Sequence, residues 1–194
     1  MKSHQRVRSM LIGVGLVLAV TSLSPLAMAD TMDAPGTVMV GGAAMLPSKN
    51  IVQNAVNSKD HTTLVAAVKA AGLVETLSGP GPFTVFAPTN EAFAALPAGT
   101  VDSLLKPENK ATLVKILTYH VVPGRLTAKD LSMKAAAGGG KAELKTVQGE
   151  TLTVSKDGDS WAVTDSKGNT AHVTIGDVIQ SNGVIHVVDK VLMP

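Results

Sequence analysis

The chain has no cysteine among its 194 residues. Thiolate catalysis, disulfide bonds, iron–sulfur clusters, cysteine-ligated zinc and a lipid anchor on a modified cysteine are therefore excluded. Aromatic residues are also scarce, with one tryptophan and one tyrosine, which leaves few surfaces on which nucleic-acid bases could stack. A domain made from this chain must be stabilised by an apolar core, and 45% hydrophobic residues are enough to build one.

A strong charge of either sign is missing as well. The whole chain carries a formal charge of +2, from 17 Lys and Arg against 15 Asp and Glu. Three of the basic residues, Lys2, Arg6 and Arg8, lie in the first 29 residues, which contain no acidic residue. The rest of the chain has 14 basic against 15 acidic residues, a net charge of −1. This near-neutral balance gives no support for a nucleic-acid partner.

The first 29 residues have the three parts of a secretory signal peptide. A basic start is followed by an uncharged run from Met10 to Leu23, and Ala27-Met28-Ala29 puts small residues where signal peptidase reads them. A membrane-spanning helix needs about 20 apolar residues, whereas a run of about 10–14 is the length of a signal core. The sequence therefore predicts cleavage near Ala29 and a secreted protein, either periplasmic or extracellular, with no membrane span in the mature chain.

The remaining chain changes its pattern twice. Residues 30–47 are rich in glycine and proline and show little periodicity, which predicts a flexible lead or a strap that lies on the domain. From residue 48 to about residue 137 apolar residues recur at helical spacing, interrupted by a strand at Phe83–Phe86. From Ala142 the period changes to two, with turn signals at Asp157-Gly158 and Asn182-Gly183. Helices followed by antiparallel strands predict one α+β domain over residues 48–194.

Several polar residues are predicted to cap helices. Ser48, Asp60 and Thr100 each precede apolar residues at helical spacing. Thr127 and Asp130 form a capping-box pattern in which aspartate replaces glutamate. A separate short strand is predicted over residues 177–180.

The sequence contains no local pattern for catalysis, a metal or a cofactor. The four histidines after the signal, at positions 61, 120, 172 and 186, do not have metal-ligand spacing, although a site assembled from distant residues stays open. There is no G-x-S-x-G elbow, and the triple glycine at 138–140 lacks the lysine and hydroxyl residue of a phosphate loop. We therefore expect no enzyme activity and no cofactor, and we interpret His120 and His186 as hydrogen-bonded structural residues.

Three segments resemble one known family. They are FTVFAPTNEAF at residues 83–93, LTYHVVPG at 117–124 and SNGVIHVVDKVLMP at 181–194. Together, over about residues 48–194, they resemble a fasciclin domain, and most closely the small single-domain secreted bacterial members. The resemblance implies a twisted β-wedge or sandwich of antiparallel strands with helices packed on one side and end. It also implies an extracellular adhesion role, with protein or polysaccharide partners on a cell surface or in a matrix, and no established catalysis.

The resemblance also suggests partner-binding residues. In animal members, a Tyr-His segment and an Asp-aliphatic pair before the last hairpin have been linked to integrin binding. The matching positions are Tyr119, His120, Asp177 and Val178, although the residues that flank the second pair differ from the animal motif. Because of that difference, the resemblance implies a contact surface rather than a particular receptor.

A second function stays open at this point. The many aliphatic residues and the eight methionines, together with fasciclin-like proteins that resemble pigment or lipid binders, suggest a carrier of a small apolar ligand. The sequence does not identify the partner or the oligomeric state.

Overall fold

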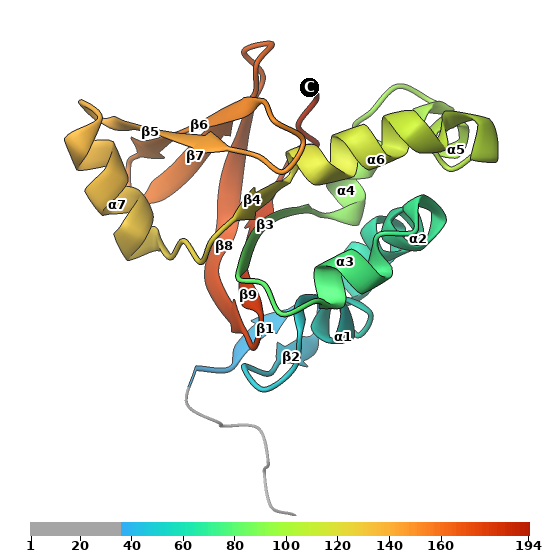
Figure 1. The fold of residues 1–194 in the computed structure, drawn as a ribbon, viewed down its shortest axis with the longest axis horizontal. Coiled ribbons are helices and arrows are strands. Elements are labelled where there is room, and N and C mark those ends of the chain that lie inside the picture. Colours follow the sequence, from blue (N-terminus) through green and yellow to red (C-terminus); the bar gives the residue numbers. More distant parts are fainter. Residues whose placement is uncertain (1–35) are drawn as a thin grey trace, which may run out of the picture. The chain divides into compact units, whose positions relative to one another are not determined.

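The computed structural model describes residues 36–194, so the predicted signal peptide and residues 30–35 lie outside the described residues. The first part of the described chain is mainly helical (Figure 1). Its elements are β1 (Val38–Val40), β2 (Ala43–Met45), α1 (Ile51–Ala55), the 3-10 turn η1 (Lys59–His61), α2 (Thr62–Ala71), α3 (Val74–Ser78), β3 (Phe83–Pro88), α4 (Asn90–Ala94), α5 (Thr100–Leu104), the 3-10 turn η2 (Pro107–Asn109) and α6 (Lys110–Tyr119).

The second part supplies most of the strands. Its elements are β4 (Val121–Pro123), α7 (Ala128–Ala137), β5 (Lys141–Lys145), β6 (Thr151–Asp157), β7 (Ser160–Thr164), β8 (Thr170–Gln180) and β9 (Gly183–Val188). The α+β class predicted from the change of period is therefore confirmed. Both predicted hairpins form, since Asp157 pairs with Ser160 and Gln180 pairs with Gly183 around Asn182.

One seven-stranded sheet organises the domain, in the order β4-β3-β9-β8-β7-β6-β5. Its pairings are antiparallel except for β3 and β9, which run parallel. At one edge, the Val147 N–H donates to the Val121 carbonyl at 2.8 Å, which brings the turn between β5 and β6 against β4. The sheet thus curls toward closure, a wedge shape that leaves helices α1–α6 on one side and α7 on the other (Figure 1).

The two faces of the sheet bury two hydrophobic clusters. Ile185 and Val187 of β9 belong to the cluster under helices α1–α6, whereas Val188 belongs to the cluster that contains Leu131 of α7. Side chains alternate between faces along a strand, so a central strand covered on both faces must be apolar throughout. Every residue of β9 is buried, which explains its unbroken apolar run.

The predicted lead contains regular structure that the sequence did not reveal. Strands β1 and β2 pair as an antiparallel hairpin, and Val40 and Met45 are buried in the core. The turn between them uses Gly41 and Gly42 at positive φ. Strands of three residues are too short for alternation to stand out among glycines.

Three of the predicted caps are wrong. Asn50, not Ser48, caps α1 and accepts from the Gln53 N–H at 2.8 Å. The 3-10 turn that contains Asp60 precedes α2, and Gly99 occupies the N-cap position of α5. A cap requires extended backbone at the right residue as well as a suitable side chain.

The remaining cap and strand predictions had mixed outcomes. The capping box of Thr127 and Asp130 is confirmed at the start of α7. The separate strand predicted over residues 177–180 is wrong, because β8 runs continuously from Thr170 to Gln180 with register shifts between Val173 and Val178.

Candidate partner-binding site

Tyr119, the last residue of α6, is fully buried. Its hydroxyl accepts a hydrogen bond from the Ser166 N–H at 2.9 Å and lies 3.4 Å from the Thr151 carbonyl, to which it donates. Burial raises the pKa of Tyr119, and the hydrogen bond from Ser166 opposes that rise. The phenol therefore ties the end of α6 to the strands of the second part of the chain.

His120 follows directly and is also buried. Its Nδ1 donates to the Ile116 carbonyl at 2.8 Å, and its Nε2 accepts from the Leu192 N–H at 3.0 Å. Burial lowers the pKa of His120 to about 4. A neutral ring with its proton on Nδ1 satisfies both bonds, as expected for a structural histidine.

Asp177 and Val178 lie at the irregular part of β8. Asp177 has φ 55°, the one positive φ outside glycine in the described chain. Its Oδ1 accepts from the Ala128 N–H at 2.6 Å, so this carboxylate caps the first turn of α7 from another element. Val178 is 1% exposed and pairs with Ile185 of β9. Of the four residues suggested by resemblance, only Asp177 is partly accessible.

Two buried aromatic rings join the predicted pairs. The Phe86 N–H donates to the His120 carbonyl at 2.9 Å. The Phe86 ring stacks on the His186 ring, with centroids 5.6 Å apart. His186 Nδ1 accepts from the Asp177 N–H at 3.4 Å, and its Nε2 donates to the Leu126 carbonyl at 2.8 Å. The structure thus connects the two pairs through the core rather than over the surface.

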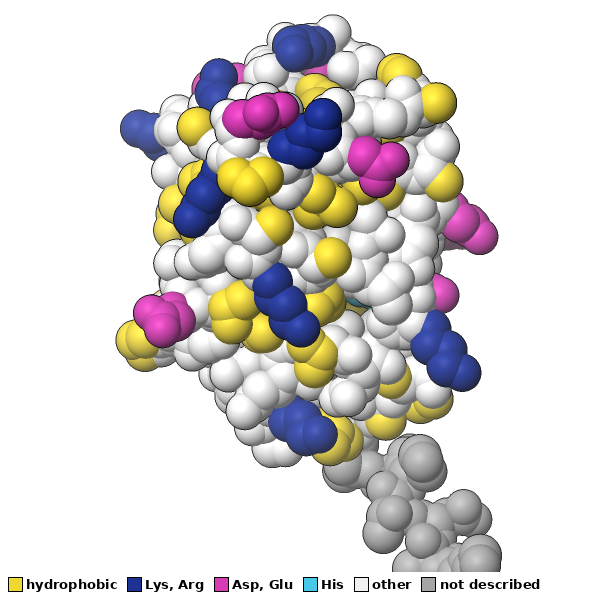
Figure 2. All heavy atoms as spheres, turned by 90° about the vertical axis from the view of Figure 1, so that its right-hand side faces the viewer, with side chains coloured by type: hydrophobic (Ala, Val, Ile, Leu, Met, Phe, Trp, Pro, Cys, Tyr) yellow, Lys and Arg dark blue, Asp and Glu magenta, His cyan; other side chains and the backbone are white. Residues whose placement is uncertain are grey.

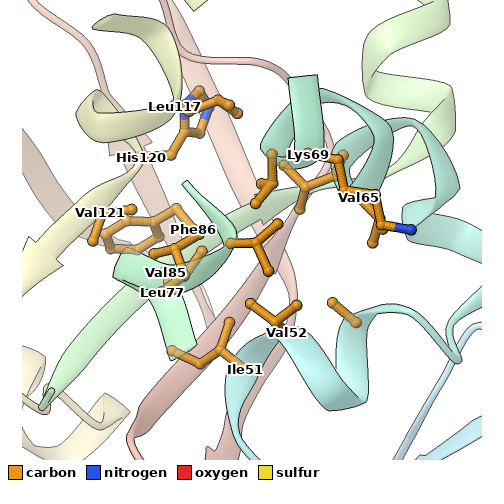
Figure 3. Close-up of a pocket in the computed structure, with 14 residues that line it drawn as sticks. Ile51, Val52, Val65, Lys69, Leu77, Val85, Phe86, Leu117, His120 and Val121 are labelled. Carbon is orange, nitrogen blue, oxygen red and sulfur yellow. The ribbon is translucent and has the colours of Figure 1, made fainter. Parts of the chain in front are cut away.

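The helical side of the domain has a small apolar notch that the sequence did not reveal. Helices α1, α2 and α3 frame it, and strand β3, the end of α6 and the start of β4 complete its wall. Twelve of the fourteen lining residues are apolar, the others being Lys69 and His120, and the cavity volume is about 40 Å³. Figure 3 shows Val65 and Lys69 at one edge, with Phe86 and Val121 across from them.

The rim of the notch is partly accessible. Val52, Val65 and Val74 are half-buried and Lys69 is exposed. Figure 2 shows that apolar side chains gather between lysines on this side of the domain. Residues 52, 69, 74 and 121 come from separate segments, so no local sequence signal could have predicted that they meet.

Two further features, a metal-binding cluster and a membrane-spanning helix, are absent from the part of the chain that the structure describes. Within residues 36–194, no group of three or more acidic or histidine side chains is arranged to hold a metal ion. In the same range, none of the helices has the length and apolarity needed to cross a bilayer.

Sequence comparisons identify relatives over the whole domain. The family model of the fasciclin domain matches residues 59–194. Protein sll1483 from Synechocystis sp. is 48% identical over 195 residues, which cover 100% of this chain and 99% of the relative. Immunogenic protein MPB70 from Mycobacterium bovis is 35% identical, over 93% of this chain and 91% of the relative. Transforming growth factor-beta-induced protein ig-h3 from Sus scrofa is 36% identical, over 82% of this chain but only 21% of that larger protein.

A solved structure has the same fold. A domain pair from the insect cell adhesion molecule Fasciclin I aligns with a TM-score of 0.66 and 19% sequence identity, covering 75% of this chain and 51% of that chain. The family match, the full-length relatives and the shared fold agree with one another. This chain belongs to the fasciclin-domain family.

Proposed function

We propose that this protein is a secreted, non-enzymatic domain that binds protein or polysaccharide partners at a cell surface or in a matrix. The observation that carries the proposal is the family match over residues 59–194. The solved structure that shares this fold comes from a protein named as a cell adhesion molecule. The mature chain starts near Asp30 in this proposal, and the domain spans residues 48–194 with the preceding segment as a strap.

The interior of the described chain fits a binding domain better than an enzyme. His61, His120 and His186 are buried, and burial lowers the pKa of each. Ser58 Oγ lies 2.9 Å from His61 Nδ1, but this serine is buried as well, and His120 and His186 bond to backbone groups. A catalytic base has to reach a substrate proton, which these buried rings cannot do.

The four residues taken from animal members enter the proposal in a changed role. Tyr119, His120 and Val178 support the surface from below, whereas Asp177 is placed where a partner could touch it. Substitutions at the three buried positions then weaken binding only as far as they weaken folding.

Retention of the purified protein on the surface of its own producing cells, and on matrix polymers, tests the proposed function. The expected result is saturable retention above an unrelated secreted protein of similar size and charge. Tyr119→Phe should bind in proportion to its folded fraction, measured by denaturant unfolding. Equal retention of the unrelated protein would contradict the proposed function.

A carrier of a small apolar ligand is the second candidate. The apolar lining of the notch favours it, but the cavity volume of about 40 Å³ is small compared with the roughly 300–1,000 Å³ of most ligand pockets. Native mass spectrometry of protein taken from its own source tests this candidate. A reproducible bound mass supports it, and bare protein counts against it.

A further inference from the structure

We propose that the notch receives one large apolar side chain of a partner protein, carried within an acidic stretch of that partner. The inference rests on the proposed function, because it names a docking site for the same surface-interaction domain. Four observations indicate which group binds in the notch: its size, the chemistry of its wall, the burial of the chain's own aromatic residues and the charge around the rim.

The size of the notch fits a side chain. Its volume of about 40 Å³ is a few times the roughly 10–15 Å³ that a single water requires on the same scale. That space accepts the branched end of a leucine or part of an aromatic ring, but not a lipid tail. Apolar anchors that fill such pockets supply much of the binding energy of protein interfaces.

The wall of the notch requires the inserted group to be apolar. Both ring nitrogens of His120, the one polar group on the floor, are already bonded to Ile116 and Leu192. Lys69 is at the rim, where its side chain is exposed. A hydroxyl or amide pushed into the notch would therefore lose its hydrogen bonds to water without replacement.

The aromatic residues of the chain itself are already used in the core. Tyr119 is fully buried and Trp161 is 9% exposed, and these are the single tyrosine and tryptophan of the sequence. Interface hot spots are rich in tryptophan, tyrosine and arginine. Because this surface offers neither ring, we expect the inserted side chain to belong to the partner, whereas this chain supplies the notch that receives it.

The charge around the notch favours an acidic partner. Helices α1, α2, α3 and α6 carry three lysines, Lys69, Lys110 and Lys115, against one acidic residue, Glu75. Lys115 lies 3.8 Å from Glu150. Within residues 36–194, Lys69 and Lys110 form no salt bridge. The Lys110 Nζ would lie 3.5 Å from a Cβ placed on Gly72, so it reaches the end of α2 that also carries Lys69.

Peptide titration tests the occupant directly. Three synthetic nine-residue peptides are added to ¹⁵N-labelled protein: a central leucine between aspartate and glutamate residues, the same peptide with alanine at the centre, and the leucine peptide with lysine flanks. We expect the first to bind at least about tenfold more tightly than the others, with amide shifts concentrated at residues 52, 65, 69 and 74. Equal binding of all three, no binding, or shifts mapped elsewhere overturns the proposal.

Two variants and a matched control test the site. Lys69→Glu reverses a charge at the rim and should weaken binding of the acidic peptide about tenfold. Lys134→Glu makes the same change on α7 and should leave the affinity for this peptide unaltered. Ala55→Leu fills the notch and should abolish binding. Unfolding curves check that each variant is folded, and the exposed Lys69 keeps the test valid if Ala55→Leu is unstable. Equal effects of the two charge reversals overturn the proposal.

Surface retention separates failure of this inference from failure of the proposed function. If the unmodified protein is retained on its producing cells and Lys69→Glu is retained equally, the notch is not the docking site, although the proposed function stands. If the unmodified protein is not retained, the proposed function itself fails. Laurate is added to the ¹⁵N-labelled protein as a further probe. If laurate shifts the amide signals of the notch residues and none of the peptides does, the inference is overturned in favour of the carrier function.

Discussion

His120 joins the end of α6 to the C-terminal segment, because its Nε2 accepts a hydrogen bond from the Leu192 N–H at 3.0 Å. The same ring donates from Nδ1 to the Ile116 carbonyl at 2.8 Å. Protonation of Nε2 would remove the acceptor that Leu192 requires and would place a charge in a site that is 2% exposed. The bond between two residues far apart in sequence therefore depends on a neutral imidazole.

Acid should destabilise the protein through this histidine. The pKa of His120 is about 4 in the fold against 6.5 as its ordinary value, so between these values the unfolded chain binds more protons. The contribution of His120 to the free energy of unfolding is therefore fully present above about pH 6.5. As the pH drops toward 4, this contribution falls by about 3 kcal/mol. The lowered pKa values of His61 and His186 act in the same direction. Denaturant unfolding at several pH values from 7 to 4 measures the slope.

His120→Gln provides the control for that slope. Glutamine can donate to one carbonyl and accept from one N–H, but it does not titrate. We expect lower stability at pH 7 together with a weaker fall between pH 6.5 and 4. An unchanged pH slope in this variant would show that other groups cause the acid sensitivity.

Asp177 should matter more for stability than its partial exposure indicates. Replacing it with alanine removes the cap on the Ala128 N–H and leaves a β-carbon at φ 55°, which we expect to cost about 1–3 kcal/mol. Asp177→Asn should cost less, because asparagine tolerates this backbone conformation. The matched control is Asp159→Ala in the exposed β6–β7 turn. Equal unfolding midpoints for Asp177→Ala and Asp159→Ala would contradict the capping role.

Two threonines at helix starts should respond differently to alanine. Thr127 accepts a hydrogen bond from the Asp130 N–H in a reciprocal capping box. Thr127→Ala should therefore lower the free energy of unfolding by about 1 kcal/mol. Thr100 lies inside α5 after the Gly99 cap, and Thr100→Ala should stay within about 0.5 kcal/mol. Thermal or denaturant unfolding separates them, and a larger loss at Thr100 would refute the assignment of the caps.

Asn182 should be the most sensitive of the turn residues. Its side chain accepts from the Ile51 N–H at 3.0 Å and donates to the carbonyls of Leu77 and Gly79 at 2.8 and 2.9 Å. Asn182→Ala would leave buried backbone groups without partners, at an expected cost of about 2–4 kcal/mol. Asn57→Ala, which removes one exposed hydrogen bond to Gln53, should change stability by less than about 1 kcal/mol. Similar losses in the two variants would contradict this difference.

Local patterns predicted those parts of the fold that local interactions decide. The capping box at Thr127 and the tight turn at Asn182 depend on neighbouring residues and were predicted correctly. Asn182 was predicted as a turn residue, but its bonds to Ile51, Leu77 and Gly79 join segments that only the folded chain brings together.

For this protein, the sequence by itself determined the absence of cysteine chemistry, the α+β order and the family. The parallel pairing of β3 with β9 was decided by the tertiary structure, as was the interior position of Tyr119 and His120. The apolar notch beside Lys69 was also decided there, because its walls come from four helices and two strands. The physical reason is the same in each case: periodicity and capping act within a few residues, whereas burial and cavities depend on which distant segments pack together.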